Sequence, residues 1–470
     1  MSDLSVLRSD VEAKVKSRSM GLKLIIVCAL ALVMTIPALF VDSLVDDRTK
    51  RAAEVIAEIS GHVGGQQTFL GPTLAIPYTI PAEGPNDSVK HGTYLVFPVR
   101  GSGVVKTTTE ERHRSLFKVP VFQADLKLDA AFDLTGVPTA APHGATLDWS
   151  HAEIVVGVSD ARGAQADALI TEGGKTLALA PAEVAQDISI GGEQNAHTKL
   201  TLFGATTDGL AKPGAKFDVS STLRFSGAQR IAVLAYGKTT QLSVQGDWAS
   251  PGFDGGLLPV TRRVSNNGFT AEWSVPFIAR GVRAEGESQL INGLDATALG
   301  VSFIEVADPY QSVNRSLKYM ALFLGLLFLT YFVFEVTTGK RVHPAQYVLV
   351  GVAQIIFYLL LLSLAERIGF DFGFLVGGAA TVGLLSANTA WVVKSRAQGV
   401  RALAVFSLLY VFIYLLLRLE DNALLVGSIA SFLAITAVMY FTRGIDWYSS
   451  LPVKGMAEAQ ASSVVPKNAG

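Results

Sequence analysis

The chain has a single cysteine among its 470 residues, and this scarcity limits how the protein can be stabilised. Cys28 lies inside an apolar run, and "LIIVCAL" lacks the small residue that normally precedes a lipidated cysteine. We therefore interpret Cys28 as an apolar filler. Because no other cysteine exists, intramolecular disulfides are excluded, and any soluble part must be stabilised by its hydrophobic core.

Charge is also scarce, since charged residues make up 17% of the chain whereas 50% is hydrophobic. A helix needs about 20 apolar residues to cross the hydrocarbon core of a membrane. We predict transmembrane helices over 22–41, 317–336, 346–365, 372–393, 402–418 and 423–441. This prediction leaves an N-terminal segment (1–21), a large external domain (42–316), a five-helix bundle (317–441) and a tail (442–470).

The distribution of cationic residues predicts how the chain is oriented in the membrane. The segments on one side carry Arg8, Lys14, Lys16, Arg18, Lys340, Arg341, Lys394, Arg396, Arg401, Arg443, Lys454 and Lys467, whereas the two short loops on the other side carry only Arg367 and Arg418. The positive-inside rule therefore predicts two cytoplasmic termini and an external domain between the first two helices. A cleaved signal peptide is the alternative for the first run, but no A-x-A-like site follows it, which favours an uncleaved anchor.

The external domain carries the alternation of β-strands. A helical pattern over 42–60 is followed by "FQADLKLDAAFDL", "FDVSSTLRF" and "GFTAEWSVP", in which apolar and polar residues alternate. Period-2 alternation indicates strands with one buried and one solvent-exposed face, which favours antiparallel pairing. We predict one large, mainly β, sandwich-like domain.

Catalytic and metal-binding motifs are absent from the sequence. The seven histidines show no metal-ligand spacing. "GVSDARG" lacks the second glycine of a nucleophile elbow, so we expect Asp160 and Arg162 to form a turn and an ion pair, with no catalytic role for Ser159. We predict no enzyme activity and no cofactor, and the net charge of −1 gives no reason to expect nucleic acid as a partner.

Polar residues in or beside the predicted membrane helices are the candidate functional residues. They are Gln354, Asn388, Glu335, Glu366 and Asp371. The acids lie at predicted helix ends, and the two amides are expected to bond neighbouring helices. Lys340, Arg341 and His343 lie in a short turn and are candidate anchors to lipid headgroups, with Pro344 suited to the first turn of the next helix.

Several segments carry a family resemblance. "DPYQSVNRSLKY", "YFVFEVTTGKRVHPAQYVLVG" and "IFYLLLLSLAERIGF" resemble the CreD family of cell envelope integrity proteins, as do "GPTLAIP", "GVSDARG", "LLPVTRRVSNNGFTAEW" and "DNALLVGSIASFLAITAVMYFTRGIDWY". The similarity covers nearly the whole chain and weakens around 82–92, 180–215 and after 452. It implies a multi-pass inner-membrane protein of a Gram-negative bacterium, with a periplasmic domain and a role in tolerance of envelope stress, and it implies no catalytic residues.

Three functions stay open at this point. The first is a non-enzymatic scaffold or stress-response protein whose periplasmic domain contacts envelope proteins. The second is a transporter or lipid-handling protein, which rests on Gln354, Asn388 and the acids at the outer helix ends. The third is an envelope hydrolase with a site assembled from distant residues. Membrane lipid is an expected partner in each case, and the sequence leaves the oligomeric state open.

Overall fold

The chain forms two compact units. The computed structural model describes residues 25–82, 88–114, 117–137, 140–141, 145–183, 189–190, 198–303, 309–338, 342–418 and 423–443. One unit comprises Met1–Thr49 with Ala307–Gly470, and the other is Lys50–Val306. The chain passes from the first to the second within α2 (Thr35–His62), which covers the helical pattern predicted over 42–60.

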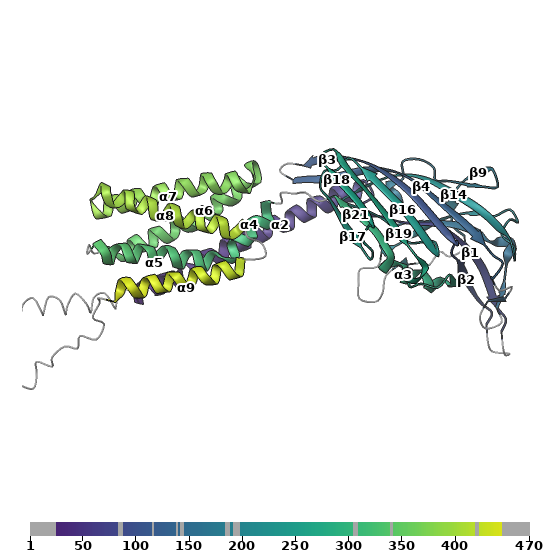
Figure 1. Ribbon diagram of the computed structural model, residues 1–470, viewed down its shortest axis with the longest axis horizontal. Coiled ribbons are helices and arrows are strands. Elements are labelled where there is room, and N and C mark those ends of the chain that lie inside the picture. Colours follow the sequence, from purple (N-terminus) through teal and green to yellow (C-terminus); the bar gives the residue numbers. More distant parts are fainter. Residues whose placement is uncertain are drawn as a thin grey trace, which may run out of the picture. The chain divides into compact units, whose positions relative to one another are not determined.

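The first unit is helical. After α2 come α4 (Pro309–Lys318), α5 (Met320–Thr338), α6 (Pro344–Ile368), α7 (Phe370–Val393), α8 (Arg396–Arg418) and α9 (Ala423–Thr442). Figure 1 shows α5 to α9 as a bundle of helices that run side by side. Because Gly373 has no Cβ, α7 approaches α6 closely: a Cβ there would lie 3.0 Å from the backbone nitrogen of Ala365.

Four helices in the described residues are long and apolar enough to cross a membrane: Ile25–His62, α6, α7 and α8. A fifth is counted if α4 and α5, which meet at a 53° bend, form one span. The prediction of six crossings is thus supported for four to five helices. The sixth crossing stays a prediction, although α9 is a helix over that window.

The second unit is built from two large sheets. An eleven-stranded sheet contains β1 (Gln67–Ile80), β2 (Lys90–Val96), β5 (Ala140–Ala141), β6 (Ala145–Leu147), β7 (Glu153–Val158), β10 (Ala180–Pro181), β13 (Thr201–Thr206), β15 (Arg230–Leu234), β17 (Pro251–Gly255), β20 (Glu285–Glu287) and β21 (Ala298–Phe303). An eight-stranded sheet has the order β18 (Thr261–Ser265), β19 (Gly268–Val275), β16 (Thr239–Gly246), β3 (Arg100–Arg114), β4 (Phe117–Asp133), β14 (Lys216–Ala228), β8 (Leu169–Glu172) and β9 (Lys175–Ala178).

Smaller elements complete this unit. They are the pair β11 (Ser189–Ile190) and β12 (Thr198–Lys199), the helix α3 (Phe277–Arg280), and the 3₁₀ helices η2 (Trp149–His151), η3 (Ala161–Gly163) and η4 (Ser288–Thr297). As predicted, Asp160 and Arg162 form a turn and an ion pair: the Asp160 carboxylate caps η3 and lies 2.6 Å from Nη2 of Arg162. Ser159 is held by the backbone, because its Oγ donates to Gln66 O at 3.0 Å and accepts from Thr68 N at 3.0 Å.

The inner faces of the two sheets share one hydrophobic core. In β4 the alternating apolar residues from Phe122 to Phe132 are buried, and in β14 Val219, Leu223 and Phe225 are buried while Phe217 is partly buried. This burial confirms the faces predicted from the period-2 pattern. Aromatic pairs join the layers: Phe69 meets Phe225 edge to face with ring centroids 5.4 Å apart, and Phe122 lies 5.1 Å from Phe303. Because each pair combines one strand from each sheet, the unit is a sandwich stabilised by its core.

Strand pairing differs from the expectation in two places. Most named pairs are antiparallel, but β1 pairs with β15 in parallel, and β16 pairs with β3 in parallel. The alternation of side chains is the same in parallel and antiparallel strands, so it does not report strand direction. The partners are far apart in sequence, which makes these pairings a property of the tertiary structure.

Candidate functional site

The turn between α5 and α6 contains a buried carboxylate. Glu335, which the sequence analysis placed at the end of a helix, is only 2% exposed. Its Oε1 accepts a hydrogen bond from Val342 N at 3.0 Å, and its Oε2 accepts one from the Tyr347 hydroxyl at 2.9 Å. Glu335 therefore holds the start of α6 against the end of α5.

His343 is exposed and begins α6. Its Nδ1 accepts a hydrogen bond from Ala345 N at 3.2 Å, and Pro344 occupies the first turn, as the sequence indicated. This is a capping role for the histidine. Lys340 and Arg341 lie outside the described residues, so their assignment as headgroup anchors stays a prediction, as does that of His343.

The two amides bond across the bundle. Gln354 of α6 is fully buried, and its Oε1 accepts a hydrogen bond from the Tyr410 hydroxyl of α8 at 2.7 Å. Its Nε2 makes no hydrogen bond within the part of the chain that the structure describes. Asn388 of α7 donates from Nδ2 to the Tyr331 hydroxyl of α5 at 3.1 Å. Both amides therefore connect helices, as expected for polar side chains inside a membrane bundle.

An ion pair connects the start of α7 to the end of α8. The Asp371 carboxylate pairs with the Arg418 guanidinium and accepts a hydrogen bond from the Tyr414 hydroxyl at 3.0 Å. Both charged side chains are about half exposed, at 48% and 55%. Glu366 is half-buried near the end of α6 and has an interaction partner of its own. The structure thus brings Asp371 together with residues that the sequence pattern did not connect to it.

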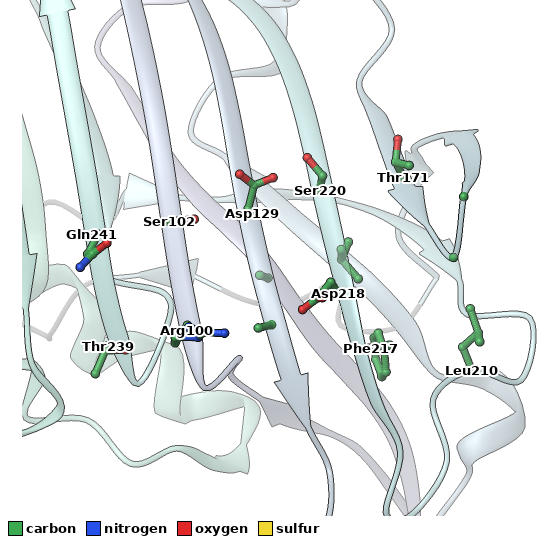
Figure 2. Close-up of a pocket in the computed structure, with 15 residues that line it drawn as sticks. Arg100, Ser102, Asp129, Thr171, Leu210, Phe217, Asp218, Ser220, Thr239 and Gln241 are labelled. Carbon is green, nitrogen blue, oxygen red and sulfur yellow. The ribbon is translucent and has the colours of Figure 1, made fainter.

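The eight-stranded sheet has a polar concavity that the sequence analysis did not predict. Strand register aligns Gln241, Ser102, Asp129, Ser220 and Thr171 on successive strands. Figure 2 shows these side chains following one another across the sheet on its outer face. They line an open cavity of about 800 Å³.

The next row of residues along the strands adds side chains of opposite charge to the same concavity. Arg100 of β3 and Asp218 of β14 lie on either side of Ala131 of β4, with which each is in register. Both line the cavity. The surface therefore offers hydroxyl and amide groups, the carboxylates of Asp129 and Asp218, and the guanidinium of Arg100. It can form hydrogen bonds along an extended polar ligand.

Glu172 is a buried polar residue that the sequence analysis also did not single out. It lies at the end of β8 with only 6% of its surface exposed, and its Oε1 makes no hydrogen bond among the described residues. Burial, followed by repulsion from Asp208, raises the pKa of its carboxyl from 4.5 to about 7. The signal in the sequence was an acid on the apolar face of an alternating strand, two residues after the buried Ile170.

No group of three or more His, Cys, Asp or Glu side chains that could hold a metal ion occurs in the described ranges. The structure therefore offers two candidate regions, which are the polar concavity of the eight-stranded sheet and the polar side chains of the bundle. Together with the apolar helices, these features define a membrane protein that combines a helical bundle with a large β-sandwich domain.

Comparison with known proteins identifies the family. The family model described as "Inner membrane protein CreD" matches residues 19–448, so the chain belongs to the CreD family. The chain is also 29% identical over 429 residues to the protein of Escherichia coli (strain K12) named "Inner membrane protein CreD". That similarity covers 90% of this chain and 92% of the relative, and with the apolar helices it supports a location in the inner membrane.

Proposed function

We propose that the chain is a non-enzymatic protein that supports the integrity of the cell envelope under stress by presenting its β domain to periplasmic envelope proteins. The observation that carries the proposal is the polar concavity of the eight-stranded sheet (Figure 2). It lies on a domain that the charge distribution predicts to be periplasmic. Family membership supports the inner-membrane setting.

The chemistry of the concavity favours binding over catalysis. Its lining residues include serine, threonine and aspartate but neither histidine nor cysteine, the usual partners in nucleophilic catalysis. Polar side chains on five adjacent strands offer donors and acceptors over an extended area. That arrangement suits a polar segment of a partner protein that crosses the strands.

A rescue assay tests which of the two units supports survival under envelope stress. The gene is deleted in the host, and survival is measured under detergent, colicin and β-lactam stress. Complementation uses the full chain, the bundle alone, and the β domain on the first helix. Rescue by the domain on one helix would support the proposal, whereas rescue by the bundle alone would overturn it.

Variants of the full chain test the surface itself. Ser102→Trp and Ser220→Trp place bulk in the concavity, and Thr201→Trp places the same residue at an exposed position of β13. We expect the first two to lose rescue at unchanged membrane levels and the third to retain it. Equal rescue by all three variants would show that the concavity is not the functional surface.

A transporter or lipid-handling protein is the second candidate. The observation that favours it is the set of buried polar contacts in the bundle, above all Gln354 with Tyr410 and Asn388 with Tyr331. Intramembrane polar side chains that mark a transport path are sensitive to loss of polarity. Replacing both amides by leucine together with Glu366→Gln would abolish rescue under this candidate and leave it intact under the scaffold proposal, provided that the variant reaches normal membrane levels.

A further inference from the structure

An apolar groove runs between α7 and α8 within the helical unit. Its lining residues recur along one side of each helix: Asp371, Phe372, Phe374, Leu375, Gly378, Ala379 and Val382 on α7, and Leu403, Ser407, Tyr410, Val411 and Tyr414 on α8. The groove has a volume of about 520 Å³. The two helices lie side by side in Figure 1.

Small residues create this groove. Gly378, Ala379 and Ser407 form its middle, where larger side chains would fill the space between the helices. At Gly378 a Cβ would already lie 3.3 Å from the ring of Tyr410. Tyr410 is fixed as one wall of the groove because its hydroxyl is bonded to Gln354. The groove is therefore bounded by a side chain that cannot easily turn into it.

The length of the groove matches one leaflet of a bilayer. From Asp371 to Val382 the helix advances about 16 Å, at 1.5 Å per residue. The hydrocarbon core is about 30 Å thick, so one leaflet is about 15 Å deep. One end of the groove coincides with the ends of two membrane helices, and the other end lies near the depth where acyl chains from the two leaflets meet.

The polar end of the groove is an ion pair and not a single charge. Asp371 pairs with Arg418, Tyr414 donates to Asp371, and the Arg418 guanidinium lies 5.8 Å from the centre of the Tyr414 ring. Both charged groups are half exposed and keep hydrogen-bonding capacity for a ligand. The cluster has no net charge, so it is complementary to a zwitterion and gives no net attraction to an anion.

We propose that this groove binds one zwitterionic phospholipid with a primary amine in its headgroup. One acyl chain lies in the groove, the phosphate contacts Arg418 and the ammonium contacts Asp371. Arginine suits the phosphate because its planar fork presents several N–H donors, and a carboxylate accepts from the ammonium. This site does not depend on the envelope role proposed above, because binding is measured without reference to survival under stress.

The test is photo-crosslinking on the full chain in nanodiscs. The probe is phosphatidylethanolamine with a diazirine in one acyl chain, and the same diazirine on phosphatidylglycerol and on diacylglycerol serves for comparison. Crosslinked peptides are assigned by mass spectrometry. We expect crosslinks on α7 and α8 at the groove, with yields at least fivefold higher for the zwitterionic probe than for either of the others.

Matched variants separate the groove from the general lipid-facing surface. Ala379→Leu and Ser407→Leu fill the groove, whereas Ala380→Leu and Ala404→Leu add the same side chain at exposed positions outside the lining. We expect the groove variants to lose crosslinking about tenfold and the controls to keep it. Arg418→Gln should remove the preference for the zwitterionic probe while leaving apolar labelling in place.

Two results would overturn the proposal. Equal crosslinking in the groove and control variants would identify the contact as ordinary surrounding lipid. Equal yields for the zwitterionic, anionic and headgroup-free probes would show that the ion pair does not select the ligand. Equal rescue by Ser102→Trp, Ser220→Trp and Thr201→Trp with intact lipid labelling, in contrast, would count against the proposed function and leave this site standing.

Discussion

Glu172 allows a quantitative prediction. Its carboxyl lies on the inner face of β8, and burial raises its pKa from 4.5 to about 7. Between these values the folded state binds more protons than the unfolded state, so the free energy of unfolding falls as the pH rises from about 4.5 to about 7 and is constant above that. Above pH 7 the folded protein carries the full cost of a buried carboxylate.

The magnitude follows from the two pKa values. At 1.36 kcal/mol for each pKa unit, the rise sets an upper limit of about 3 kcal/mol. Because β8 lies one strand from the edge of the sheet, residual contact with water reduces the effect, and we expect about 1–2 kcal/mol. Glu172→Gln keeps the shape of the side chain and cannot ionise. It should therefore stabilise the β domain by this amount at pH 8 and have little effect at pH 5.

The assay is thermal unfolding of the full chain in detergent, followed by the near-ultraviolet signal of the β domain between pH 5 and 8. Glu183→Gln, which changes an exposed glutamate of the same unit, is the matched control. An equal effect of Glu172→Gln at both pH values, or a destabilisation at pH 8, would refute the reasoning. Identical pH profiles for the wild type and Glu172→Gln would do the same.

Three further substitutions test the contacts described above. Gly71→Ala should destabilise the β domain by about 1–3 kcal/mol, because its Cβ would lie 2.5 Å from the buried ring of Tyr236; thermal unfolding checks this. Glu335→Leu should cost about 2–5 kcal/mol, because it leaves two buried donors unsatisfied, whereas Glu335→Gln should cost less; unfolding in detergent separates the two. Tyr410→Phe removes the hydroxyl that donates to Gln354 but preserves the packing of the ring. It should lower the free energy of unfolding by about 1–3 kcal/mol, which is measured as a lower unfolding midpoint.

Local patterns in the sequence determined the elements of this protein. The membrane helices follow from uncharged runs because hydrocarbon excludes charge over a fixed thickness. The buried faces of β4 and β14 follow from alternation because successive side chains of a strand point to opposite faces. The turn at Asp160 and the cap at His343 follow from neighbours in the chain. Each of these features is decided by residues within a single helix, strand or turn.

The sites were decided by the tertiary structure. The sequence singled out Gln354, Asn388 and Asp371, but it did not name Tyr410, Tyr331 or Arg418 as their partners. Those partners lie 47 to 57 positions away along the chain, and helix packing sets which side chains meet.

The polar concavity arises in the same way. Ser102, Asp129 and Ser220 each lie on the solvent-facing side of a strand, and only strand order and register place them side by side. The chain alone thus determines which residues face a core, a membrane or water. Which of them share a site depends on contacts between distant segments, since the energy of those contacts comes from packing that no local pattern encodes.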